Sequence, residues 1–207
     1  MKNPEIRIYF ANLLYELESK RLAGDVPLRD VKQYMGWTEA YKKEWSKYEA
    51  KIVPALQKAV GVSFYRPVID VACAPFFRCR STPLIMSFRF EPPVFVEVLQ
   101  HELTHVLFTD NNKVSIIGDS PKLDLMKEWT KLFGKHPTTV LNHIGVHAMS
   151  EHIYLDVLKQ PERLDAEIAR IKKDKAVDYQ KSWEYVKKTG YKKILNQLKE
   201  MYDGVPT

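Results

Sequence analysis

Five consecutive residues, His101-Glu102-Leu103-Thr104-His105, carry the clearest chemical signal in the chain. They form the pattern H-E-x-x-H. Residues four apart lie on the same face of a helix, so both imidazoles can reach one metal ion. Glu102 follows the first histidine directly, so its carboxylate can take a proton from a water molecule on that ion. The pattern therefore predicts a zinc (Zn2+) site with His101 and His105 as ligands and Glu102 as the general base.

The residues around this pattern favour a helix. Pro92 and Pro93 can open one, because proline suits a first helical turn. Apolar residues then recur with helical spacing at Val94, Val98, Leu99, Leu103, Val106 and Leu107. A glutamate between two histidines in such a run costs free energy unless something compensates, and a cation would compensate. The alternative is a buried helix whose polar side chains bond to neighbouring groups.

A catalytic zinc site uses three protein ligands and one open position, so one ligand is missing. All six histidines lie between residues 101 and 152, and a helix is expected from Thr138 to about Lys159. Its apolar face is marked by Leu141, Ile144, Ala148, Leu155 and Leu158. Glu151 lies within that face, where a lone carboxylate is costly to bury. We therefore predict Glu151 as the third ligand, with His147 as the first alternative and His152 as the second.

The other polar residues of this helix have separate expectations. His147 lies one turn before Glu151 and, if it belongs to the site, could donate a hydrogen bond to an oxyanion. Tyr154 is a weaker candidate for that catalytic role. The alternative for His147 is a core histidine bonded to a backbone carbonyl. His152 falls on another side of the helix, where it could bond Asp156 one turn later.

The elements that must position these residues indicate an α+β fold, mostly helical, with a small β-sheet beside the H-E-x-x-H helix. We expect one domain in three parts: an N-terminal helical part (1–61), a core (62–159) and a C-terminal helical part (160–207). The core should contain strands over 62–65, 68–72 and 84–90, because these runs are β-branched or aromatic. If the strand over 84–90 is a sheet edge, a peptide could pair with it.

The N-terminal part is expected to be helical throughout. A first helix is predicted from the three-to-four spacing of Ile6, Tyr9, Phe10, Leu13, Leu14 and Leu17. A short helix should end at Gly36, with Thr38 as the N-cap of the next one. Pro54 should kink or interrupt that helix, and Gly61 should end it.

Composition limits the remaining classes of function. The chain has 207 residues and a net charge of +6, and no apolar stretch reaches the roughly 20 residues of a membrane helix. The first residues lack the layout of a signal peptide, so we expect a cytoplasmic protein whose Cys73 and Cys79 are thiols. We expect no nucleic-acid partner, although Trp183, Tyr185 and Tyr191 in the basic C-terminal part could stack on bases.

With these residues the sequence resembles the zincin metallopeptidases, over Leu84 to about Asp156. The resemblance implies a strand before the motif helix, zinc on His101 and His105, and a peptide or protein substrate. Among the subgroups it is similar to the gluzincins, which take a glutamate from the next core helix, although Leu155 stands where they commonly have an acid. The alternatives are a non-catalytic metal-binding or interaction protein that retains a zincin fold, and a nucleic-acid-associated protease.

Overall fold

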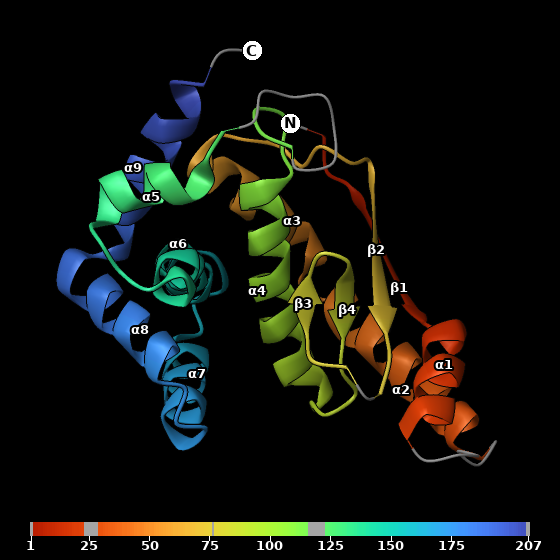
Figure 1. The fold of residues 1–207 in the computed structure, drawn as a ribbon. Helices are drawn as coiled ribbons and strands as arrows, with labels where there is room; N and C mark the ends of the chain where they lie inside the picture. Colours follow the sequence, from red (N-terminus) through yellow and green to blue (C-terminus); the bar gives the residue numbers. More distant parts are fainter. Residues whose placement is uncertain (1, 23–28, 76, 116–122, 206–207) are drawn as a thin grey trace. The chain divides into compact units, whose positions relative to one another are not determined.

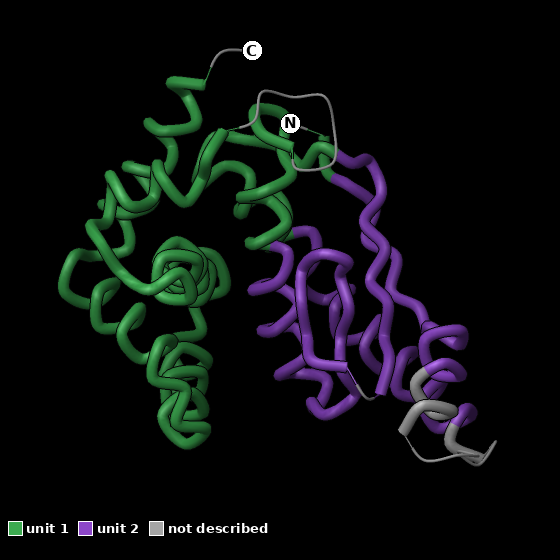
Figure 2. Tube along the Cα trace, in the orientation of Figure 1, with its two compact units in different colours: residues 1–3, 51–65, 104–207 green, residues 4–50, 66–103 purple. Residues whose placement is uncertain are grey.

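The computed structural model describes residues 2–22, 29–75, 77–115 and 123–205. The chain forms two compact units (Figure 2). One comprises residues 1–3, 51–65 and 104–207, and the other comprises residues 4–50 and 66–103. The division passes through two helices, α3 (Glu49–Val60) and α4 (Pro92–Thr109). Our division of a single domain into three parts stays a prediction.

The smaller unit contains a four-stranded sheet of order β1-β2-β4-β3. Its strands are β1 (Glu5–Phe10), β2 (Val68–Cys73), β3 (Arg80–Ser81) and β4 (Leu84–Met86). β2 is parallel to both of its neighbours, and β3 is antiparallel to β4. With the helices, this sheet confirms the α+β class and the mostly helical character of the chain.

β1 corrects the first of our helix predictions. Ile8 is buried in this strand while Arg7 and Tyr9 on either side of it are exposed, which is the period of two that a half-buried strand requires. The segment pairs with β2 along its whole length, from Glu5 opposite Val68 onwards. The helix α1 (Asn12–Leu22) begins only after the strand has ended. Sheet pairing thus prevails over a helical spacing that the apolar residues satisfy only loosely.

α2 (Arg29–Ser46) fixes the start of the motif helix within the same unit. The ring of Tyr41 stacks on that of Phe95 at a centroid distance of 3.9 Å, and its hydroxyl donates to the carbonyl of Phe90 at 2.6 Å. α2 is continuous through Gly36, so the break predicted there is wrong. Thr38 is not an N-cap, because it lies inside the helix and donates to the carbonyl of Tyr34. Gly61 ends α3 with a positive φ of 73°, as predicted, and Pro54 lies inside that helix.

β4 is shorter than the strand expected over 84–90 and ends at Met86. It lies between β2 and β3, so it is not a sheet edge. The condition for peptide pairing along β4 is therefore not met, because its backbone groups face strands on both sides. Cys73 and Cys79 are both free thiols, as expected. In the described part of the chain, no helix combines the length and the apolarity needed to cross a membrane.

The larger unit is helical and is built around α6 (Thr138–His152), which packs against α5, α8 and α9 (Figure 1). This unit also contains α5 (Leu125–Phe133), the π-helix η1 (Ile153–Leu158), α7 (Pro161–Lys173), α8 (Val177–Thr189) and α9 (Tyr191–Asp203), with most of α3 and the end of α4. α6 is buried nearly all round between Val140 and Glu151, as a central helix must be. Its polar residues are therefore held in the core of this unit.

Candidate metal centre

The pattern H-E-x-x-H lies on α4, which begins at Pro92 as predicted and runs unbroken to Thr109. His101 and His105 are one helical turn apart, so they share a face of this helix. The division between the two units falls after Leu103, inside α4. The helix itself therefore places His101 and Glu102 next to His105.

His143 on α6 lies beside His105. Their rings meet edge-on, at an interplanar angle of 81° and with centroids 4.9 Å apart. Gly145 makes this approach possible, because a Cβ atom there would lie 2.7 Å from Cε2 of Phe108 and 3.0 Å from Cδ1 of Leu198. Real Cβ atoms essentially never come within 3.0 Å of such an atom, so the contact with Phe108 could not form without a shift. Because Gly145 has no side chain, α6 can pack closely against the end of α4, and its histidines come near His105.

The ring of His143 is oriented by its own helix. Its Nδ1 lies 2.7 Å from the carbonyl oxygen of Thr139. A carbonyl only accepts, so Nδ1 carries the proton and the lone pair is on Nε2. Metal-binding histidines commonly donate their second ring N–H to a backbone carbonyl in this manner, which fixes both the tautomer and the ring direction.

Among the described residues, two sets of side chains could hold a metal ion. The ligand atoms of His101, His105 and His143 lie within 4.8 Å of one another, and so do those of His101, His147 and Glu167. The first set offers three imidazoles, a donor set that suits zinc with a fourth position open. The second set offers two imidazoles and a carboxylate, which zinc also accepts.

His147 is fully buried and stacks on Trp183 at a centroid distance of 4.5 Å. Its Nδ1 lies 2.9 Å from Oγ of Ser182, and that hydroxyl donates its single proton to the carbonyl of Tyr179. Nδ1 of His147 must therefore be the donor in the contact with Ser182. The lone pair of His147 is then on Nε2, which suits a metal ligand. An oxyanion donor needs a proton at that atom instead.

Glu167 on α7 is a residue that the sequence analysis missed. It is buried, and its Oε2 accepts from the hydroxyl of Tyr154 at 2.9 Å. The hydroxyl of Tyr154, our weaker candidate for an oxyanion donor, thus already donates its proton to Glu167. A signal was available, because Glu167 lies in the same stripe as Leu164 and Ile171. Glu167 is thus a carboxylate within an apolar stripe, the same signal by which Glu151 was predicted.

The structure brings Glu151 into neither of the two sets. Oε1 of Glu151 accepts from Nζ of Lys187 on α8 at 2.9 Å. Oε2 is buried and has no hydrogen-bond partner among the described residues. His152 also lies outside both sets and bonds Oδ2 of Asp156 through Nδ1 at 3.0 Å, as the sequence predicted. The carboxylate of Glu151 is therefore compensated by a lysine.

Burial sets the protonation of the site. It raises the pKa of Glu102 to about 7, where the carboxyl group can gain and lose a proton near neutral pH. Burial, and then the neighbouring His143, lowers the pKa of His105 to about 3. The pKa values of His143 and His147 are also lowered, mainly by burial. His105, His143 and His147 are consequently neutral at pH 7, which is the form that binds metal.

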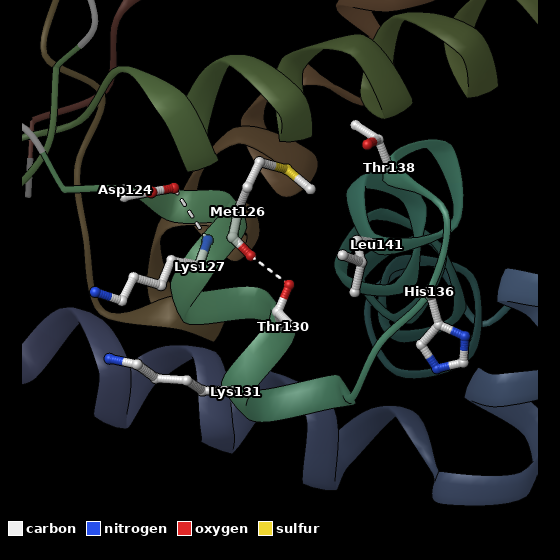
Figure 3. Close-up of a pocket in the computed structure, with 8 residues that line it drawn as sticks. All are labelled: Asp124, Met126, Lys127, Thr130, Lys131, His136, Thr138 and Leu141. Carbon is white, nitrogen blue, oxygen red and sulfur yellow. Dashed lines mark hydrogen bonds between the residues drawn. The ribbon is translucent and has the colours of Figure 1, made fainter.

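His136, the remaining histidine, lies elsewhere in the same unit. It lines a cavity of about 510 Å³ between α5 and the start of α6, together with Thr138 and Leu141 (Figure 3). Figure 3 shows Lys127 and Lys131 on the α5 side of this cavity. The ring of His136 packs against Tyr185 at a centroid distance of 5.6 Å. His136 is in neither of the two sets that could hold a metal.

Comparison of the chain with models of protein families, with curated proteins and with solved structures gave no match.

Proposed function

We propose that the protein is a zinc-dependent metallopeptidase with a zincin-like fold, in which His101, His105 and His143 hold the metal and Glu102 is the general base. One observation carries the proposal. A third imidazole, oriented by the carbonyl of Thr139, lies against His105 of the pattern H-E-x-x-H. The site thus has the three ligands and the adjacent base that hydrolysis at a zinc centre requires.

The chemistry divides between the ion and the chain. When bound, zinc would activate a water molecule and polarise the carbonyl group of a peptide bond. The Glu102 carboxylate would take the proton of that water and later pass it to the leaving amine. The near-neutral pKa of Glu102 supports both transfers. Burial of Glu102, at 8% exposure, keeps bulk water from competing for the proton.

His143 is preferred to Glu151 as the third ligand because of the partners that each residue has. Glu151 has Lys187 as a cationic partner, so its charge needs no metal. His143 presents its lone pair on Nε2 and lies beside a residue of the motif. His147 is assigned to holding the packing around the site, through Ser182 and Trp183.

A peptide or protein substrate is favoured over a nucleic acid by the aromatic residues of α8 and α9. Trp183 is 3% exposed and stacks on His147. Tyr185 packs edge-on against Phe133, and Tyr191 donates its hydroxyl to Asp156. Tyr185 and Tyr191 are half-buried and, like Trp183, have partners within the larger unit, so these three rings do not form an exposed platform for bases.

The test combines a zinc measurement with a cleavage assay. Purified protein is analysed for bound metal and is then incubated with a library of peptides, whose cleavage is followed by mass spectrometry. Glu102→Gln should keep the zinc and abolish cleavage, whereas His105→Ala should lose the zinc. Glu91→Gln, which changes an exposed acid just before α4, should preserve both.

Two results would contradict the proposal. Cleavage by Glu102→Gln at the wild-type rate would show that Glu102 is not the base. Bound zinc without cleavage of any peptide by the wild-type protein would instead support the non-catalytic metal-binding alternative.

A further inference from the structure

A cavity of about 440 Å³ lies in the smaller unit, beside the segment that connects β4 to α4. Its lining includes two arginines, three aromatic rings and a serine: Arg78, Arg89, Tyr34, Phe77, Phe88 and Ser87. The volume is in the range of small-molecule and side-chain pockets in proteins. It is separate from the metal ligands and plays no part in the chemistry assigned to Glu102.

The charge of this cavity is not neutralised from within. Arg78 and Arg89 are both exposed, and neither guanidinium forms an ion pair with the described residues. The guanidinium carbon of Arg89 lies 4.7 Å from the ring centroid of Phe90, a contact that limits where the side chain can point. Two guanidinium groups at one cavity form a site for an anion, since each offers a planar fork of N–H donors.

The aromatic rings give the cavity an apolar wall. Tyr34 and Phe88 are stacked with their centroids 4.9 Å apart, and Phe88 also stacks on Tyr41 at 5.8 Å. These contacts hold the wall in place through α2. Low-dielectric walls strengthen the attraction between an anion and the arginines, and they also pack against methylene groups. The preferred occupant is thus an anionic group on a short apolar stem.

The same unit holds the general base, and Cys79 connects the two places. The pKa of the Cys79 thiol is raised to about 11, mainly by burial; the hydrogen bond from Ser87 opposes the rise, the Glu102 carboxylate adds to it, and the Arg89 guanidinium also opposes it. Both charges therefore act on the same sulfur atom. The sulfur also accepts a hydrogen bond from the backbone N–H of Ser87, a lining residue, at 3.2 Å. Cys79 is therefore bonded to a residue that lines the cavity, and its pKa responds both to Arg89 and to Glu102, the proposed general base.

We infer that the cavity is a subsite for a carboxylate of the substrate, held by Arg78 and Arg89 with its stem against Phe88. The inference rests on the proposed peptidase function, because a peptide offers such a carboxylate either on an acidic side chain or at its C-terminus. The subsite selects which peptides are held near Glu102. Arg78 and Arg89 are specificity residues and take no part in the proton transfers.

The test measures binding without hydrolysis, in the inactive Glu102→Gln protein. The probes are tetrapeptides blocked at both ends with glutamate or glutamine at the third position, and a tetra-alanine peptide with a free C-terminal carboxylate. Binding is followed through the Nε–H resonances of the arginine side chains. We expect a carboxylate probe to shift the signals of Arg78 and Arg89 and to bind about tenfold more tightly than the glutamine peptide.

The variants and controls separate the outcomes. Arg89→Gln should bind the glutamate and glutamine peptides equally, whereas Arg80→Gln, which removes an exposed charge outside the cavity, should keep the preference. Binding of only the free C-terminal carboxylate would identify the chain end as the source of the anion. Equal binding of all peptides, or a response to inorganic phosphate alone, would overturn the inference. These results are independent of metal loading and cleavage, so the proposed function is tested separately.

Discussion

The imidazole of His143 meets that of His105 edge-on, with ring centroids 4.9 Å apart. One residue comes from the recognisable motif and the other from a helix that begins 33 residues after it, at Thr138. The contact depends on Gly145, which lets α6 approach Phe108 of α4. The packing of α6 against the end of α4 therefore sets the position of the third ligand of the proposed zinc site.

Removal of this imidazole should release the metal. His143→Ala deletes one of three ligands, so we expect the zinc content of the purified protein to fall to near zero. Glu151→Ala is the matched comparison, because it truncates a side chain on the same helix that bonds Lys187. It should keep stoichiometric zinc. Elemental analysis of both variants decides between them, and the reverse pattern would restore Glu151 as the ligand.

Ser182→Ala tests the role of His147. The variant leaves a buried N–H of His147 without its acceptor, which costs about 1–3 kcal/mol of the free energy of unfolding. We expect a lower melting temperature but a zinc affinity within about threefold of the wild type, because His147 is not a ligand in the proposed set. A loss of about 10–100-fold in affinity would instead favour the set with Glu167.

The control for this prediction is Ser46→Ala. Ser46 also donates to a carbonyl three residues earlier, that of Lys43, but it is exposed and contacts no histidine. Its replacement should change neither the melting temperature nor the zinc affinity measurably. A comparable loss of stability in both variants would show that the bond to His147 contributes little.

Gly145→Ala should separate α6 from the end of α4. The new Cβ atom would lie 2.7 Å from Phe108, so the ring or the helix must move, at a cost of about 1–3 kcal/mol. Zinc affinity should fall as well, because His143 moves with its helix. Gly36→Ala is the control, since nothing lies within 4 Å of its Cβ position and α2 should gain about 0.5–1 kcal/mol. Chemical denaturation measures both changes.

Glu102→Gln should change the pH dependence of stability in metal-free protein. Burial raises the pKa of Glu102 from 4.5 to about 7, so between these values the folded state holds a proton that the unfolded state has lost. Stability contributed by this group is then lost as the pH rises from 4.5 to 7. The glutamine variant lacks this loss, and we expect it to be more stable at pH 8 by roughly 1–3 kcal/mol.

The comparison of the wild-type protein with Glu102→Gln needs no further control variant. The lowered pKa of His105 removes stability as the pH falls from 6.5 towards 3, because the unfolded state then binds the extra proton. That effect is present in both proteins and cancels in the difference. The advantage of Glu102→Gln should therefore vanish near pH 4.5. An equal difference at pH 4.5 and at pH 8 would contradict the raised pKa of Glu102.

The helix that carries H-E-x-x-H could be predicted from the sequence, because every signal for it is local. Pro92 opens α4 as expected, and Glu102 is buried between the two histidines. α7 begins at Pro161 through the same local signal, a proline in the first helical turn. β1 was missed because its strand character depends on pairing with β2, about sixty residues later in the chain.

The proposed third ligand could not be chosen from the sequence for a geometric reason. His143, His147 and Glu151 are spaced by four residues, and each such step turns the direction of the side chain by about 40°. All three therefore share one broad face of α6. The neighbours decide between them: Lys187 lies by Glu151, Ser182 by His147, and His105 by His143. These neighbours are set by tertiary packing.

The π-helical segment Ile153–Leu158 has a consequence for how this chain should be compared with others. A π turn holds about one residue more than an α turn, so everything beyond it is rotated by about 100°. Relatives that have kept the arrangement without the extra residue would align with this sequence only across a one-position gap between 153 and 158. A search for relatives of this chain should therefore allow a gap at these positions.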